Sequence, residues 1–193
     1  FAKEKKIVLS EYDRAESQPQ YAFSRQMQRI LWYEYPSRKI TLGSREAIAN
    51  ATVEQMKTIK STYYVPNNSA LLVAGDIPAE EAFAMAEEVY GDWPKGEDPF
   101  EANPIPEHPA LDGSRFLVQE GDVKVPSVDI RWQGPSVDED PEATYAADVL
   151  SFILGQPSSK FQKALVDSGV ALNANLSYYT QRHTGPIMAS AKR

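Results

Sequence analysis

A proline-rich segment in the middle of the chain, residues 94–112, constrains the fold more than any other feature of the sequence. It reads PKGEDPFEANPIPEHPALD and contains five prolines and many charged residues. Proline has no backbone N–H and interrupts both helix interiors and central strands, so this composition is typical of a linker. We therefore expect a domain boundary here, between residues 1–105 and residues 113–193.

Helical periodicity dominates the part before this linker. Apolar residues at helical spacing predict helices over 1–17, 21–35, 53–64 and 79–93. Thr52 and Gln55 form the signature of a capping box at the start of the third helix. The run SALLVAG, residues 69–75, is short, continuously apolar and flanked by turn residues, which predicts a buried central strand.

The part after the linker alternates strands and helices. Strand patterns cover 114–120, 127–134, 171–181 and 185–193, and helical patterns cover 141–155 and 158–169. Together with the first part, this order predicts an α+β fold made of two α/β sandwich units with mostly antiparallel sheets.

Composition excludes several classes of protein. The net charge is −7, the pI is near 4.9 and no basic stripe stands out, so nucleic acid is not an expected partner. The chain contains no cysteine, which excludes disulfides, thiolate nucleophiles and cysteine-based zinc sites. No apolar run reaches the roughly 20 residues needed to span a bilayer. A soluble protein in the bacterial periplasm, the cytoplasm or an organelle is compatible with these properties.

The usual nucleotide and serine-hydrolase motifs do not occur in this sequence. It contains no G-x-G-x-x-G, no G-x-x-x-x-G-K-[ST] and no G-x-S-x-G. The two histidines, His108 and His183, lie in the proline-rich segment and in a predicted turn, too far apart in sequence for a helical zinc pair. The chain starts at Phe1 within a helical pattern that has no cap, so we expect it to be part of a longer protein.

A cluster of aromatic and basic residues follows the predicted strand at 171–181. Tyr178, Tyr179, Arg182 and His183 could contact a peptide, or they could simply form a hairpin turn. Alternating tyrosines and polar residues are common in an edge strand and its turn, so we favour the hairpin.

The first helix carries two carboxylates, Glu4 and Glu11, seven residues apart in the stretch EKKIVLSE. At 3.6 residues per turn they share one stripe with Val8, beside Ile7, on a side expected to face a core. A buried carboxylate needs a cation, a metal or hydrogen-bond donors. In the alternative, both acids are simply on the surface, and Glu11 pairs with Arg14.

The order of these segments resembles that of a known family. EKKIVLSEYDRAESQP is followed by LGSREAIANATVEQMKTIKSTYYVPNNSALLVAGDI, and then by GPSVDEDPEATYAADVLSFILG and SSKFQKALVDSGVALNANLSYY. This series resembles the insulinase/pitrilysin (inverzincin) zinc metallopeptidases, including mitochondrial processing peptidase subunits, over essentially all 193 residues. The resemblance implies the C-terminal part of a zinc-binding domain in 1–105 and the N-terminal part of an inactive domain in 113–193.

The resemblance also implies roles for the two acids. In that family an H-x-x-E-H helix supplies two histidine ligands and a general-base Glu, and the second Glu of a downstream E-x6-E pattern completes the zinc site. Carried over, Glu11 is the third zinc ligand and Glu4 supports it. The H-x-x-E-H motif is absent from this sequence. The substrate-holding Arg/Tyr pair of the family is also missing, since the nearest positions are Val166 and Leu172.

These observations predict part of a zinc metallopeptidase that hydrolyses unfolded peptides. The resemblance implies a partner half or subunit that closes a chamber around the substrate. Without H-x-x-E-H, we expect no catalytic residue within these 193 residues and no activity from them alone; no substrate-binding residue can be assigned. Two alternatives are an inert subunit that holds peptides or has a structural role, and an unrelated α+β binding module.

Overall fold

The computed structural model describes residues 1–193, apart from the side chain of Ser37. The chain forms two compact units: unit 1 contains residues 1–5 and 46–106, and unit 2 contains residues 6–45 and 107–193. The boundary after Pro106 lies inside the predicted linker, whereas residues 6–45 group with the C-terminal part. The assignment of 1–105 and 113–193 to two domains therefore remains a prediction.

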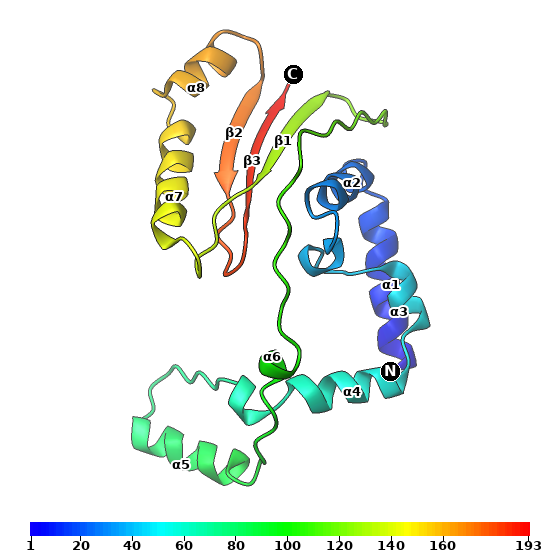
Figure 1. The fold of residues 1–193 in the computed structure, drawn as a ribbon, viewed down its shortest axis with the longest axis vertical. Coiled ribbons are helices and arrows are strands. Elements are labelled where there is room, and N and C mark those ends of the chain that lie inside the picture. The colour runs from blue at the N-terminus through cyan, green and yellow to red at the C-terminus, as the bar shows by residue number, and fades with distance from the viewer. The chain divides into compact units, whose positions relative to one another are not determined.

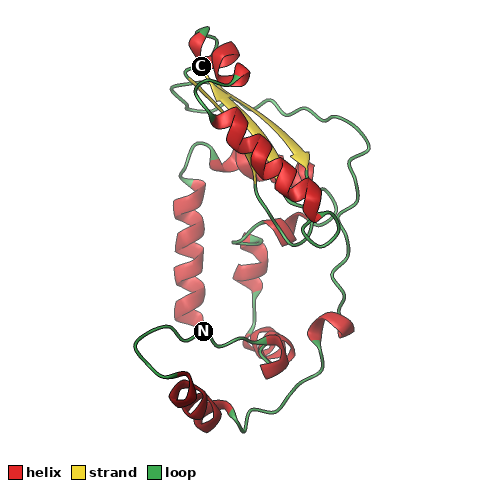
Figure 2. Ribbon diagram, turned by 90° about the vertical axis from the view of Figure 1, so that its left-hand side faces the viewer, coloured by secondary structure: helices red, strands yellow, loops and turns green.

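Helices account for most of the regular structure, and strands occur late in the chain (Figures 1 and 2). In chain order the elements are α1 (Ala2–Glu16), α2 (Tyr21–Leu31), η1 (Pro36–Lys39), α3 (Arg45–Asn50), α4 (Val53–Tyr63), η2 (Pro66–Asn68), α5 (Ala79–Tyr90), α6 (Pro99–Ala102), β1 (Ser127–Gln133), α7 (Pro141–Gly155), α8 (Lys160–Gln162), η3 (Lys163–Asp167), β2 (Asn173–Tyr178) and β3 (Pro186–Lys192).

The predicted capping box at the start of α4 is confirmed. The backbone N–H of Gln55 donates to Thr52 Oγ1 at 3.2 Å, and the backbone N–H of Thr52 donates to Gln55 Oε1 at 2.9 Å. Both bonds satisfy N–H groups at the helix start that have no partner within the helix. This local chemistry explains why α4 begins where the sequence predicts.

The predicted strand at 69–75 is wrong, because this segment is irregular and no strand forms among the described residues of unit 1. Leu72 is 87% exposed. The predicted strand at 114–120 in unit 2 is also wrong, and its Phe116 is 94% exposed. A strand requires a neighbouring strand for its backbone hydrogen bonds, and apolar composition alone does not supply one.

Unit 2 contains one antiparallel sheet with the strand order β1-β3-β2. Ile130 of β1 pairs with Ala189 of β3, which pairs in turn with Leu176 of β2. The predicted α+β class with an antiparallel sheet is confirmed for this unit. The helix predicted over 158–169 is shorter than expected, since it divides into α8 and the π-helical turn η3.

The two faces of this sheet differ in chemistry because side chains alternate along each strand. One face carries apolar residues and is covered at β2 by α7, where Ala174 and Tyr178 are buried (Figure 1). At β1 the apolar residues of this face are exposed, including Val128 at 65%. The opposite face carries polar residues that lie toward α2, and Gln133 Nε2 donates to the carbonyl of Leu31 at 3.0 Å.

None of the described helices combines the length and the apolar character needed to cross a membrane.

Candidate functional site

The part of α1 that belongs to unit 2, residues 6–16, is held mainly through Tyr12, whose side chain is 1% exposed. Its hydroxyl donates to the carbonyl oxygens of Leu42 at 3.2 Å and Gly43 at 2.5 Å. Arg25 donates to the same Gly43 carbonyl at 2.9 Å. Gly43 has φ of +67°, a left-handed conformation that favours glycine and that closes the turn after Ile40. These contacts fix which side of α1 is buried.

Glu4 and Glu11 are both exposed. Ile7 is also exposed, at 44%, whereas Val8 is half-buried. The prediction that the two acids lie on the core-facing side is therefore wrong for the described chain. Tyr12 follows Glu11 by one residue, so its side chain points about 100° away around the helix. The acidic stripe borders the buried side instead of lying on it.

The four acids of α1 fall into two pairs. Arg45 donates to Asp13 at 2.6 Å and to Glu16 at 2.9 Å, and the two carboxylates raise the pKa of Arg45. Among the described residues, Glu4 and Glu11 form no ion pair: their exposure agrees with the surface alternative, although the Glu11–Arg14 pair that it allows is not seen. The two acids singled out by the sequence are thus the ones without a cationic partner.

A catalytic zinc site requires a defined number and kind of ligands, and the described residues supply only part of them. Glu oxygen is a suitable ligand, but a catalytic zinc site takes three protein ligands in addition to water. No group of three or more His, Cys, Asp or Glu side chains that could hold a metal occurs among the described residues. Glu11 could supply one ligand, and the described residues do not complete a zinc site by themselves.

His108 is a half-buried side chain in an aromatic cluster that sequence reasoning did not predict. Both ring nitrogens are buried and lack a hydrogen-bond partner among the described residues. The ring packs against Trp32 at 4.8 Å and Tyr35 at 5.8 Å between centroids. Burial, together with the positive charges of Lys39 and Arg38 and a smaller effect of His183, lowers the pKa of His108 to about 4. The imidazole is therefore neutral at physiological pH.

Lys39 lies beside this ring cluster and links η1 to the turn between β2 and β3. Its ammonium donates to the carbonyl of Thr184 at 2.6 Å and to Gln181 Oε1, and it lies 4.7 Å from the centroid of the Trp32 ring. Burial and the nearby Arg38 lower the pKa of Lys39 to about 8. These contacts give Lys39 a structural role in unit 2.

The cluster at 178–183 forms a hairpin turn, as predicted. Tyr178 ends β2, and its hydroxyl donates to the carbonyl of Pro135 at 2.9 Å. Arg182 is paired with Asp138 at 2.7 Å. Tyr178 and Arg182 contact the chain itself, whereas Tyr179 is 61% exposed, and these contacts are those of a hairpin turn.

Comparison with known proteins defines the family. Residues 50–193 match the family described as the peptidase M16 inactive domain, and the chain belongs to this family. The match continues through the proline-rich segment at 94–112. The insulinase-like resemblance of the sequence is therefore confirmed.

Similar proteins carry names that fit this family. The zinc protease PqqE of Helicobacter pylori (strain ATCC 700392 / 26695) is 28% identical over 135 residues, which cover 69% of this chain and 30% of that protein. The crystal structure of a protease from Helicobacter pylori has a TM-score of 0.82 at 23% identity, covering 99% of this chain and 47% of that one. The periplasmic protease PqqL from Escherichia coli has a TM-score of 0.72 at 17% identity, covering 98% of this chain and 21% of that one.

These comparisons establish the fold and the family. They also show how much of each similar protein the chain covers. The chain spans less than half the length of each of these three proteins. What the comparisons show for the described residues is the fold and membership of the peptidase M16 inactive domain family.

Proposed function

We propose that the chain is part of a zinc-dependent metalloendopeptidase that hydrolyses peptide bonds in unfolded peptides, with Glu11 as one zinc ligand. The observation that carries the proposal is the pair of exposed carboxylates, Glu4 and Glu11, that have no ion-pair partner on a helix fixed by Tyr12. The similarity to a protein named as a zinc protease supports it.

The proposal gives the two acids different roles. Glu11 would contribute an anionic oxygen ligand to the metal, and Glu4, two turns earlier on the same stripe, would hold and orient the surrounding ligands by hydrogen bonding. Bound zinc would act as a Lewis acid for peptide hydrolysis. The remaining ligands and the general base would come from outside these 193 residues, and a second half or partner subunit would close the chamber around the peptide.

Substitution of the acids in the longer protein tests this assignment. Glu11→Gln removes one anionic ligand, so zinc content per chain and cleavage of an unstructured peptide should fall together by more than 100-fold in affinity or rate, roughly the loss of one strong ligand. Glu4→Gln should lower them by roughly 10–100-fold, as expected for a group that orients a ligand.

The matched control is Glu88→Gln, which changes an exposed acid of α5 that forms no ion pair among the described residues. It should leave zinc content and cleavage unchanged. Equal zinc content in the Glu11→Gln and Glu88→Gln proteins would reject Glu11 as a ligand. Glu16, on the same helix, would be a poorer control, because its carboxylate contacts Arg45.

The 193 residues alone should bind zinc weakly and should not cleave peptides. One or two carboxylates leave at least two ligand positions of a zinc site unfilled. Isothermal titration with zinc measures this directly, and stoichiometric binding at micromolar affinity or tighter would mean that the ligands lie elsewhere in the chain.

A second candidate function is that of an inert subunit that holds peptides or supports a partner. The description of the matching family as an inactive domain favours it. The two candidates differ in the longer protein: a protein that contains H-x-x-E-H and loses zinc on Glu11→Gln is a peptidase, whereas one without the motif is an inert relative.

A further inference from the structure

A cavity of about 220 Å³ lies within unit 2, between the first turn of α2 and the polar face of the sheet. Its walls include Ser24 of α2, Asp129 and Arg131 of β1, and Lys192 of β3. Ser127, Asp129 and Arg131 lie on one side of β1 because alternate residues of a strand face the same way. The cavity thus brings two cationic side chains and one carboxylate to one space.

Arg131 is the most buried cation that lines this cavity, and its polar contacts are long. Its side chain is only 10% exposed, and its polar contacts among the described residues are Ser24 Oγ at 3.4 Å and Asp129 at 4.0 Å. A guanidinium has five N–H donors, and a buried cation without close acceptors is costly. Burial lowers the pKa of Arg131 and Asp129 opposes that effect only in part. This arrangement would be stabilised by an anion in the cavity.

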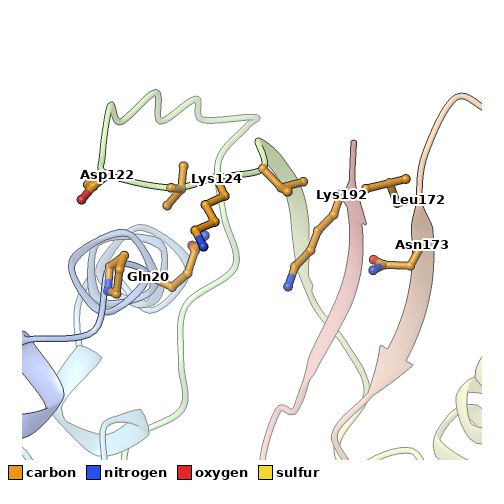
Figure 3. Close-up of a pocket in the computed structure, with 9 residues that line it drawn as sticks. Gln20, Asp122, Lys124, Leu172, Asn173 and Lys192 are labelled. Carbon is orange, nitrogen blue, oxygen red and sulfur yellow. The ribbon is translucent and has the colours of Figure 1, made fainter.

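A wider groove of about 480 Å³ continues from this cavity, since Gln20 and Lys192 line both. Figure 3 shows Lys192 on β3 and Lys124 on a separate loop, both among the residues that line the groove. The remaining wall is largely apolar, with Pro19, Val123, Val125 and Leu172. Lys124 and Lys192 form no ion pair among the described residues.

Charge and shape together define the kind of ligand that fits. Three cations and two acids, Asp122 and Asp129, border the combined space and leave one net positive charge in a chain whose net charge is −7. The first turn of α2 adds backbone N–H groups, because its N-cap Gln20 forms no side-chain cap. A ligand that carries one negative charge attached to an apolar group would fit both the charged cavity and the apolar groove.

We propose that the cavity and groove bind the carboxyl-terminal end of a peptide that has an apolar last side chain. The terminal carboxylate lies in the inner cavity and accepts hydrogen bonds from Arg131 and Lys192, and the apolar side chain lies in the groove against Val123 and Leu172. This site uses neither Glu4 nor Glu11, so it is independent of zinc.

Calorimetric titration with acetylated alanyl-alanyl-leucine tests the proposal, using the free acid, its C-terminal amide and hexanoate as probes. The free acid should bind at least tenfold more tightly than the amide, because the amide lacks the charge that Arg131 and Lys192 receive. It should also bind more tightly than hexanoate. Equal binding of acid and amide, or no binding of the acid at millimolar concentration, would overturn the proposal. Hexanoate binding as tightly as the peptide would overturn the peptide assignment.

Variants locate the binding on the protein. Arg131→Gln should weaken binding of the free acid about tenfold, the usual effect of losing a charge-assisted hydrogen bond. Lys192→Gln, at an exposed position, should weaken it severalfold and keeps the test valid if Arg131→Gln does not fold. Lys163→Gln, an exposed control in η3, should bind as the parent protein does. An unchanged affinity in Lys192→Gln would place the binding elsewhere.

Discussion

Both sides of helix α1 carry acidic residues, but the acids of the two sides differ in their contacts. On one side Tyr12 is buried, and Asp13 and Glu16 are both held by Arg45. On the other side Glu4 and Glu11 are exposed and form no ion pair among the described residues. Asp13 and Glu16 are paired with a cation of the same unit, whereas Glu4 and Glu11 have no ion-pair partner among the described residues.

The largest effect on stability that we expect from the side of α1 that contains Tyr12 is that of Tyr12→Ala. This change removes a fully buried aromatic ring and two hydrogen bonds, so the free energy of unfolding should fall by about 3–5 kcal/mol. Urea denaturation monitored by circular dichroism measures the loss. Glu11→Gln, one residue away, should change the same free energy by less than about 0.5 kcal/mol, because it alters an exposed group. Comparable losses in both variants would show that the two sides of α1 contribute equally to stability.

Substitution of Tyr12 by Phe sharpens the same comparison. It keeps the ring and removes only the hydroxyl that donates to the carbonyls of Leu42 and Gly43. The expected loss is about 1 kcal/mol, since a neutral hydrogen bond contributes that much on balance. A loss as large as that of Tyr12→Ala in the same denaturation experiment would mean that the hydroxyl, and not ring burial, holds the helix.

The pH dependence of stability tests whether buried groups outside α1 hold unit 2. The pKa of His108 is lowered to about 4, so the folded state keeps the ring neutral while the unfolded state takes up a proton near pH 6.5. This stability is fully present above pH 6.5 and is lost as the pH falls toward about 4. His108→Phe should flatten the decline of unfolding midpoints across that range, and an unaltered decline would show that other groups cause it.

Arg45→Gln should have the smallest effect. It removes the cation that contacts Asp13 and Glu16, and exposed ion pairs of this kind contribute little and are screened by salt. We expect a slight decrease of the melting temperature at low ionic strength that disappears in high salt. Zinc content of the longer protein should not change. A loss of zinc would mean that Asp13 or Glu16, the acids paired with Arg45, contributes to the zinc site.

Local patterns in the sequence predicted local structure well. Periodicity located the long helices, and the side chains of Thr52 and Gln55 specified the start of α4, because these features depend on residues a few positions apart. The segments 69–75 and 114–120 were predicted as strands from their apolar residues alone. Pairing depends on residues far away in the sequence, and neither segment has a partner strand among the described residues.

Prediction of the candidate sites was limited in the same way, because it too depended on contacts between residues far apart in the sequence. The spacing of Glu4 and Glu11 correctly put them on one stripe, but the buried direction of α1 was set by the distant carbonyls of Leu42 and Gly43. The burial of His108 likewise depends on contact with Trp32 and Tyr35, more than 70 positions earlier in the sequence. A single polar residue in a proline-rich segment carries no signal of such contacts.

The most direct test of Glu11 as a zinc ligand is a crystal structure of the longer protein grown with zinc. We expect a carboxylate oxygen of Glu11 at roughly 2.0–2.2 Å from the metal, with Glu4 close enough to hydrogen-bond to one of the other ligands. A zinc ion bound by other residues, with Glu11 still exposed to solvent, would contradict it.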